Sequence, residues 1–275
     1  MSTPMTQAGL LARRALAERV ALQAGALALG HFRGREALLI ESKRHLQDVV
    51  TEADREVETL IRKAIAAEFP EDALLGEEHG IAAGTSGLIW IIDPIDGTAP
   101  FLAGLPGWCV SIGAADAEGP ALGVIHAPVL EETFVAARGA GARLNGAPIK
   151  VTRRFDLRTG LLGIGANDRV DARTVGRMLG DLSEAGASWT RYGSGALMLA
   201  WVAAGRLVGY LEPRMSAWDC MAGYCLIQEA GGRVLPFPDG EHLTRPAPVL
   251  GAPPHVHDEL LAISRLDDDA VWGAR

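Results

Sequence analysis

The chain has 275 residues, a formal net charge of −8 and a pI near 5.4. Hydrophobic residues make up 48% and charged residues 22%, a composition that is typical of a globular protein and excludes a disordered one. Because no block of lysine or arginine stands out, neither nucleic acid nor an anionic membrane is expected as the main partner. A phosphate substrate fits this charge if a metal reverses the local field.

The three cysteines, Cys109, Cys220 and Cys225, form no CxxC pair, so they indicate neither a disulfide framework nor a zinc knuckle. The first 30 residues mix arginine and glutamate with leucine and alanine, as an amphipathic helix does and a signal peptide does not. No stretch approaches the roughly 18 to 20 apolar residues of a membrane span. We therefore expect a soluble, cytoplasmic protein with no membrane partner.

The first half of the chain predicts two helices followed by an antiparallel sheet. Helical periodicity covers residues 10–32 and 54–69, and the polar residues 43–54 between them indicate a loop. Strands of a meander are expected at residues 88–92, 109–115, 121–127 and 132–137, with a hairpin signal at Asn145-Gly146.

From about residue 150, strands alternate with helices, which predicts an α/β unit with a mixed sheet. The expected strands are residues 161–164, 207–211 and 233–235, and the expected helices are residues 170–186, 194–204 and 218–230. The proline-rich segment 236–254 is interpreted as a surface excursion. We therefore divide the chain into an N-terminal α+β lobe, residues 1–149, and a C-terminal α/β lobe, residues 150–275.

The predicted central strand ends in two carboxylates, Asp93 and Asp96, three residues apart. Pro94 lacks an N–H and cannot extend a sheet ladder, so we expect the chain to turn there. Gly97 and Thr98 then stand where a helix would begin, with N–H groups that can face an anion. Carboxylates beside an anion site indicate a hard divalent metal between them, although the same string is also ordinary turn chemistry.

Three more acidic clusters lie at the predicted ends of strands and helices. They are Asp48 to Asp54 before a helix, Gly76-Glu77-Glu78 after the strand-like residues 73–75, and Trp218-Asp219 at a helix N-terminus, where the dipole keeps a carboxylate ionised. Each cluster alone has a cap or a turn as its structural explanation. Four together are difficult to explain as solvated surface, and they predict one shared site.

These clusters resemble the motifs of the inositol monophosphatase family, among the metal-dependent, lithium-sensitive sugar phosphatases. The family pattern D-x-V-T-x-x-D, G-E-E, D-P-[IL]-D-G-T and W-D-x-x-A-G reads here as residues 48–54, 76–78, 93–98 and 218–223. The resemblance spans residues 43–232. It implies the layered αβαβα sandwich of the inositol monophosphatase/fructose bisphosphatase fold, and a homodimer.

The resemblance also implies which residues hold metal. Glu77, Asp93 and the backbone carbonyl of Ile95 would bind a first Mg²⁺. Asp93 would bridge to a second Mg²⁺, shared by Asp96 and Asp219. A third, weaker ion near Glu77 is common in the family, so two or three Mg²⁺ are expected per active site.

Further roles follow from the same resemblance. Glu77 and Thr98 would orient the attacking water, and Asp54 would accept a hydrogen bond from the Thr98 hydroxyl. Backbone N–H groups of Gly97 and Thr98 would hold phosphate oxygens. The contacts to the rest of the substrate would come from Gly195 and Glu212, the latter placed in a loop that enters the next helix.

A few further residues need an interpretation of their own. Ala99-Pro100 stands where the family usually has a polar pair, and Pro100 removes one N–H near the substrate although a first helical turn tolerates it. Arg214 is either solvated or faces a second anionic group of the substrate. Lys43 falls where the family often has a basic residue on a mobile loop. His255 and His257, before a terminal helix, are expected to be solvated.

The predicted function is Mg²⁺-dependent hydrolysis of small phosphate monoesters, by in-line transfer of phosphoryl to water. Inositol monophosphate or a related polyol or sugar phosphate is the expected substrate. Histidinol-phosphate, fructose-1,6-bisphosphate and adenosine bisphosphate phosphatases share every metal motif and remain alternatives. A remoter alternative is a regulatory protein that interacts with the transcription machinery.

Overall fold

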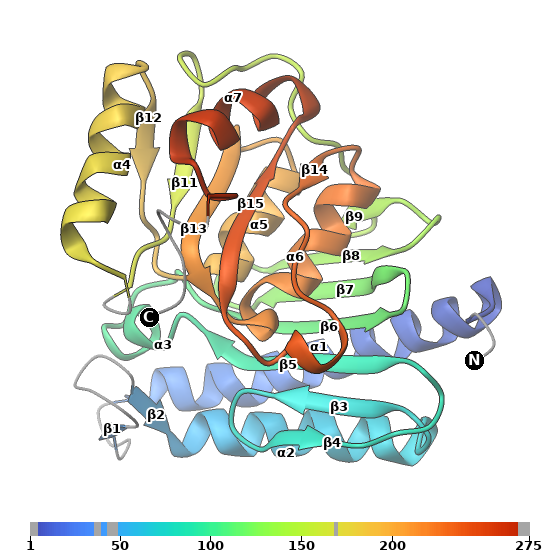
Figure 1. The fold of residues 1–275 in the computed structure, drawn as a ribbon. Coiled ribbons are helices and arrows are strands. Elements are labelled where there is room, and N and C mark those ends of the chain that lie inside the picture. Colours follow the sequence, from blue (N-terminus) through green and yellow to red (C-terminus); the bar gives the residue numbers. More distant parts are fainter. Residues whose placement is uncertain (1–4, 36–39, 43–48, 168–169, 269–275) are drawn as a thin grey trace.

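The computed structural model describes residues 5–35, 40–42, 49–167 and 170–268. Helices and sheets alternate in five layers (Figure 1), which confirms the predicted αβαβα sandwich. From one face to the other the layers are α1 and α2, an eight-stranded sheet, α5 and α6, a five-stranded sheet, and α4 with α7. Among the described residues, no helix is both long and apolar enough to cross a membrane.

The outer helical layer and the eight-stranded sheet come from the first half of the chain. The helices are α1 (Gln7–Arg33), α2 (Glu52–Glu68) and the short α3 (Thr98–Leu102), and the strands are β3 (Ala73–Gly76), β4 (Gly80–Ala82), β5 (Ile89–Asp96), β6 (Cys109–Asp116), β7 (Gly119–Ala127), β8 (Glu132–Ala137), β9 (Ala142–Leu144) and β10 (Ala147–Pro148). The strand order β10-β9-β8-β7-β6-β5-β3-β4 confirms the antiparallel meander; only β3 and β5 pair in parallel. The hairpin signal is also confirmed, because Asn145 and Gly146 both have positive φ between the paired strands β9 and β10.

The prediction that the chain turns at Pro94 was wrong. Strand β5 continues through Pro94 to Asp96, and its pairing with β6 shifts from Asp93↔Ser111 to Asp96↔Cys109. Three steps along β5 therefore oppose two along β6, which is a β-bulge with one extra residue. A proline without an N–H is tolerated inside such a bulge because the ladder is interrupted there.

The expected loop at residues 43–54 was wrong in part. Residues 49–51 form strand β2 (Val49–Thr51), which pairs with β1 (Ile40–Ser42), and α2 already begins at Glu52. Lys43 and Asp48 lie outside the described residues.

The second sheet has the order β12-β11-β13-β15-β14 and is mixed, as predicted. Its strands are β11 (Leu161–Ile164), β12 (Ser188–Thr190), β13 (Gly209–Met215), β14 (Arg233–Val234) and β15 (Ala247–Ala252), and its helices are α4 (Ala172–Glu184), α5 (Gly195–Ala203), α6 (Ala217–Glu229) and α7 (Pro254–Ser264). The interpretation of residues 236–254 as a surface excursion was wrong, because β15 lies between β13 and β14 and is mostly buried. His257 of α7 was expected to be solvated, but it is buried, at 4% exposure.

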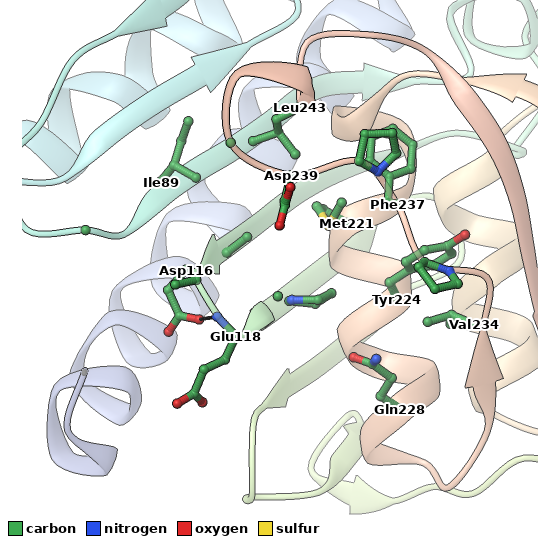
Figure 2. A pocket seen from close by; sticks show the side chains of 18 residues that line it. Ile89, Asp116, Glu118, Met221, Tyr224, Gln228, Val234, Phe237, Asp239 and Leu243 are labelled. Carbon is green, nitrogen blue, oxygen red and sulfur yellow. Dashed lines mark hydrogen bonds between the residues drawn. The ribbon is translucent and has the colours of Figure 1, made fainter. Parts of the chain in front are cut away.

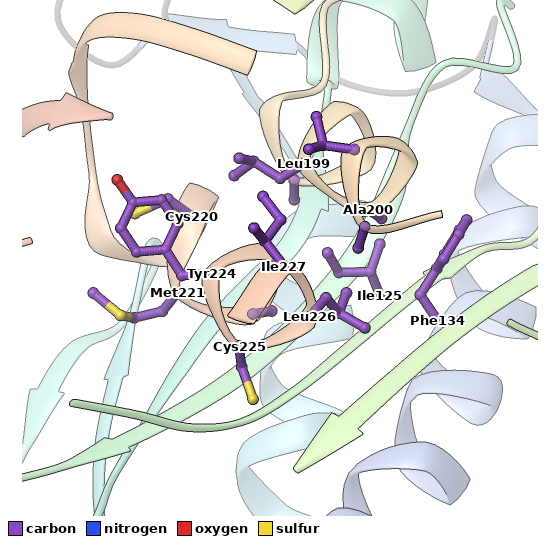
Figure 3. Packing of buried hydrophobic residues seen from close by; sticks show 14 of the residues in the cluster. Ile125, Phe134, Leu199, Ala200, Cys220, Met221, Tyr224, Cys225, Leu226 and Ile227 are labelled. Atoms are coloured by element: carbon purple, nitrogen blue, oxygen red, sulfur yellow. The ribbon is translucent and has the colours of Figure 1, made fainter. Parts of the chain in front are cut away.

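Helices α5 and α6 lie between the two sheets and form the middle core. Residues of α6 from Cys220 to Ile227 pack against Leu199 and Ala200 of α5 and against Ile125 and Phe134 of the first sheet (Figure 3). Gly123 permits this contact, since an added Cβ would lie 2.2 Å from the Ala222 carbonyl oxygen. The last strand of the first sheet, β10, ends at Pro148 and the first strand of the second sheet, β11, begins at Leu161, whereas the division into two independent lobes at 149/150 stays a prediction.

Candidate active site

Three carboxyl groups converge at the end of strand β5. Asp93 and Asp96 lie on the bulged part of β5, and Asp219 lies in the first turn of α6. One carboxylate oxygen from each lies within 4.8 Å of the other two. The structure thus brings together three of the predicted metal ligands from positions more than 120 residues apart in sequence.

The Asp93 side chain is held in the bulge by a backbone N–H two residues further along the strand. Its Oδ1 accepts a hydrogen bond from the Ile95 N–H at 3.0 Å, which stabilises the irregular turn of the strand around Pro94. The residue is 1% exposed. Burial, followed by the charges of Glu77 and Asp96, raises the pKa of Asp93 well above its usual range.

Asp96 connects the first sheet to helix α5. Its Oδ2 accepts a hydrogen bond from the Ser194 hydroxyl at 2.5 Å and another from the Ala196 N–H at 2.7 Å. Ser194 is the N-cap of α5, so a carboxylate from one half of the chain satisfies the helix start of the other half. Burial raises the pKa of Asp96 to about 6, against the opposing effect of these donors.

Asp219 reaches the site from the C-terminal half. Its Oδ2 accepts the Ser216 N–H at 3.1 Å, which fixes the carboxylate at the start of α6. The Ser111 hydroxyl, opposite Asp93 on β6, donates to the Trp218 carbonyl at 3.3 Å and ties the helix to the first sheet. Burial, then the charges of Asp96 and Glu77, raises the pKa of Asp219 well above its usual range.

Glu77 lies near this cluster, in the turn that follows strand β3. It follows Gly76, the last residue of β3, and its N–H donates to the Ile92 carbonyl of β5 at 3.2 Å. Because β3 and β5 run in parallel and Gly76 pairs with Ile92, Glu77 and Asp93 follow paired residues at the same level of the sheet. Asp54 is buried in the first turn of α2, and its predicted contact with Thr98 stays a prediction.

The residues after Asp96 form the expected helix start. Gly97 is the N-cap of α3 with φ of +97°, and an added Cβ would lie 2.7 Å from the Gly107 carbonyl oxygen, so this position requires glycine. First-turn N–H groups have no partner within their helix, which suits them to an anion. The Thr98 hydroxyl donates to the Ile95 carbonyl at 3.3 Å.

A polar cavity of about 190 Å³ adjoins the carboxylates. Four predicted residues line it together: Asp96, Asp219, Gly195 and Glu212. Glu212 lies within strand β13, so its assignment to a loop before the helix was wrong.

Glu212 is held in place by two neighbours. Its carboxylate accepts hydrogen bonds from the Tyr210 hydroxyl at 2.6 Å and from Asn167 Nδ2 at 3.0 Å. Burial raises the pKa of Glu212, and these two hydrogen bonds oppose the rise. Asn167 also donates to the Arg214 carbonyl at 2.7 Å.

Sequence reasoning missed Ser194, Asn167, Tyr210 and Arg191, all of which line the cavity. Ser194 carried a signal, because serine before a helical pattern is a typical N-cap. The other three side chains reach the site from segments with no motif of their own.

A larger cavity, of about 690 Å³, lies elsewhere. Figure 2 shows Met221 and Tyr224 of α6, Phe237, and Asp239 around a common space. This cavity borders Ile89, the first residue of β5, whereas the carboxylates lie at the other end of that strand. It contains none of the predicted metal or substrate residues, so the smaller cavity is the candidate site.

The donor set suits a hard divalent cation. The three clustered side chains offer only carboxylate oxygens, and Mg²⁺ prefers oxygen ligands. Burial raises the pKa of all three carboxyls, and neighbouring carboxylates raise those of Asp93 and Asp219 further, so a bound cation would favour their ionised forms. The arrangement can therefore bind metal beside a small polar cavity.

The sequence model of the inositol monophosphatase family matches residues 12–267. The chain belongs to this family. A Haemophilus influenzae protein named Nus factor SuhB is 35% identical over 250 residues, covering 90% of this chain and 93% of the relative. Inositol monophosphatase 1 of Solanum lycopersicum is 40% identical over 205 residues, covering 70% and 73%. The crystal structure of the extragenic suppressor protein SuhB from Bartonella henselae has a TM-score of 0.86 at 29% identity, covering 92% and 98%.

The family membership confirms the resemblance and the fold predicted from the motifs. The fold is that of metal-dependent small-molecule phosphatases, and the described residues contain a cluster of three carboxyl groups. The expectation that nucleic acid is excluded as a main partner is not supported, because relatives of this chain are named Nus factors.

We predict that the metal-free protein becomes less stable as pH rises through about 6, because Asp96 has a raised folded-state pKa. A raised pKa contributes stability below the unfolded pKa of about 3.9, and that stability is lost as pH rises through the folded value. Urea unfolding is measured in chelator at pH 5 and pH 7.5. Between these pH values, the free energy of unfolding of wild type should fall by on the order of 1 kcal/mol more than that of Asp96→Asn. Saturating Mg²⁺ should restore wild type, and parallel pH curves for the two proteins would contradict the argument.

Proposed function

We propose that the chain is a Mg²⁺-dependent phosphatase of small phosphate monoesters, with inositol monophosphate or a related polyol or sugar phosphate as substrate. The observation that carries the proposal is a cluster of three carboxyls, two buried and one half-buried, beside a polar cavity that Glu212 lines. A binding protein for a neutral ligand would gain nothing from this concentration of negative charge.

The residues proposed to hold two or three Mg²⁺ are Glu77, Asp93, the Ile95 carbonyl, Asp96 and Asp219. When bound, Mg²⁺ would supply Lewis acidity, lowering the pKa of the attacking water and neutralising charge on the phosphate and the leaving oxygen. Asp93 would be shared between the ions, since its neighbour Ile92 pairs with Gly76, which precedes Glu77, and Asp96 lies on the same bulge.

The remaining roles belong to the strand end and the start of α3. Glu77 and Thr98 would orient the attacking water, with Asp54 supporting Thr98. The N–H groups of Gly97 and Thr98 would hold phosphate oxygens, since they belong to the first turn of a helix. Catalysis would thus consist of positioning and charge neutralisation, as phosphoryl transfer requires.

The cavity would receive the non-phosphate part of the substrate. Glu212 offers acceptor oxygens there and Arg191 offers donors, which suits a hydroxylated group. Histidinol phosphate, fructose 1,6-bisphosphate and adenosine bisphosphates are the competing substrates, and a panel of these with inositol 1-phosphate would rank them. We also propose a homodimer and a cytoplasmic location; the three free, buried cysteines suit a reducing compartment.

A second candidate role is interaction with the transcription machinery. It is favoured by the 35% identity to a protein named Nus factor SuhB. If Asp93→Asn protein restored the wild-type phenotype to a deletion strain of the source organism, the protein would have a role independent of turnover. Restoration only by active protein would leave phosphatase activity as the sufficient explanation.

We predict that hydrolysis requires Mg²⁺ and that Asp93→Asn abolishes it, because an amide cannot serve as a bridging anionic ligand. The measurement is phosphate release from inositol 1-phosphate with Mg²⁺ and with excess chelator. Asp156→Asn, an exposed aspartate in a turn outside the site, is the control and should retain activity. Full turnover in excess chelator would contradict the proposal that hydrolysis requires bound Mg²⁺.

We predict that Thr98→Ala lowers kcat on the order of 100-fold while KM changes little, because the backbone N–H remains and only the hydroxyl is lost. Thr98→Ser keeps the hydroxyl and should retain most of the turnover. If KM rose instead with kcat unchanged, Thr98 would be a ground-state binding residue.

We predict that Glu212→Gln changes substrate preference more than chemistry, because Glu212 faces the cavity rather than the strand end. An unsatisfied hydrogen bond to a substrate hydroxyl should cost roughly 1–3 kcal/mol in relative kcat/KM. An aryl phosphate without hydroxyls is the matched control substrate and should be hydrolysed almost as fast as by wild type. An equal loss on every substrate would assign Glu212 to the metal site or the fold.

A further inference from the structure

Helix α2 buries two carboxyl groups one turn apart, Asp54 and Glu58. Asp54 belongs to a motif, whereas Glu58 has no role in the proposed reaction. Its side chain is completely buried, on the same helix face as Val57 and Ile61. A carboxyl in such a place is destabilising unless its oxygens are hydrogen-bonded, so its contacts decide what it does.

Both Glu58 oxygens bind the turn that follows Glu77. Oε2 accepts the Glu78 N–H at 2.7 Å, and Oε1 accepts the His79 N–H at 3.2 Å. The His79 ring nitrogen Nδ1 lies 3.3 Å from Oε1. One buried carboxyl group therefore holds two consecutive peptide N–H groups directly after a proposed metal ligand.

Arg62, one turn further along α2, contacts both Glu58 and the same turn. Its Nε–H donates to Glu58 Oε1 at 2.6 Å, and its other end donates to the Gly80 carbonyl. The guanidinium compensates the charge of Glu58 and anchors the far side of the same turn. Side chains of α2 therefore hydrogen-bond the backbone of each residue from Glu78 to Gly80.

The chain before Glu77 is held equally firmly, but by the sheet. Gly76 pairs with Ile92, and the Glu77 N–H donates to the Ile92 carbonyl, so Glu77 leaves β3 in register with Asp93. An added Cβ at Gly76 would lie 2.0 Å from Glu58 Oε1. The glycine therefore lets the carboxylate of α2 come within reach of the turn.

We propose that Glu58 is a positioning residue: it fixes the backbone on the far side of Glu77, so that the Glu77 carboxylate faces Asp93 and Asp219, and thereby sets the affinity of the site for Mg²⁺. The sheet alone fixes only one side of Glu77. This inference rests on the proposed function, because it takes Glu77 as a metal ligand.

A purely structural role predicts a different result. In that case Glu58 would stabilise the turn and the fold, and its loss would lower stability without changing the metal affinity of the folded protein. Asp72 provides the matched control, because it is also a buried carboxylate, at the opposite end of β3. It accepts two hydrogen bonds from Arg13 and one from Trp90 Nε1.

The experiment measures Mg²⁺ binding by isothermal titration calorimetry, without substrate, for wild type, Glu58→Gln and Asp72→Asn, with thermal unfolding in chelator alongside. Glu58→Gln keeps the shape but loses one acceptor for the turn. We expect its Mg²⁺ affinity to fall about tenfold or more, the size found when partners of metal ligands are removed. Asp72→Asn should lower the unfolding temperature and keep the affinity within about twofold of wild type.

Arg62→Met is the second variant, and it keeps the proposal testable if Glu58→Gln does not fold. It leaves both turn N–H contacts but removes the Gly80 anchor and the compensating charge, so we expect a smaller loss of affinity in the same direction. Wild-type affinity in both Glu58→Gln and Arg62→Met, or in Arg62→Met alone if only that variant folds, would overturn the inference. A wild type that binds Mg²⁺ but hydrolyses no monoester would instead overturn the proposed function, and a wild type that binds no Mg²⁺ would overturn both.

Discussion

Mutual repulsion among carboxyl groups at the end of β5 is the constraint around which this site is built. Burial raises the pKa of Asp93, Asp96 and Asp219, and the nearness of the carboxyls adds to the cost of ionising Asp93 and Asp219. The fold lowers the cost with fixed donors: the Ile95 N–H, the Ser194 hydroxyl with the Ala196 N–H, and the Ser216 N–H. Each donor binds one particular carboxylate oxygen. The orientation of each carboxylate toward a cation is therefore fixed before any cation binds.

The bulge in β5 makes this convergence possible. In a regular strand, residues three apart point to opposite faces of the sheet, so Asp93 and Asp96 would diverge. The extra residue between them re-aims the chain, and the Asp93–Ile95 hydrogen bond closes the irregular turn. Pro94 has no N–H to leave unpaired there, so the residue that argued for a chain reversal is the one that a bulge accepts most easily.

Sequence reasoning succeeded where the signal is local. Periodicity located α2 and β8, and the acidic motifs located the three clustered carboxyls, because both signals are carried by residues that are neighbours in the sequence. It failed for β15, where prolines around a short apolar segment hid a strand that is buried by partners far away in the chain. It also placed Glu212 in a loop, and it had no means to find Asn167, because the contact that binds these two spans 45 residues of sequence.

Helices α5 and α6 connect the two sheets at the candidate site. Both belong to the second half of the chain, yet the N-cap of α5 hydrogen-bonds Asp96 and the first turn of α6 carries Asp219 into the end of the first sheet. Their position depends on close packing, since Gly113 and Gly123 of the sheet leave room for the α6 backbone. A shift of α6 along the sheet would therefore move a proposed metal ligand and a wall of the cavity together. The middle layer thus couples the proposed chemistry of the first half to the proposed substrate recognition of the second.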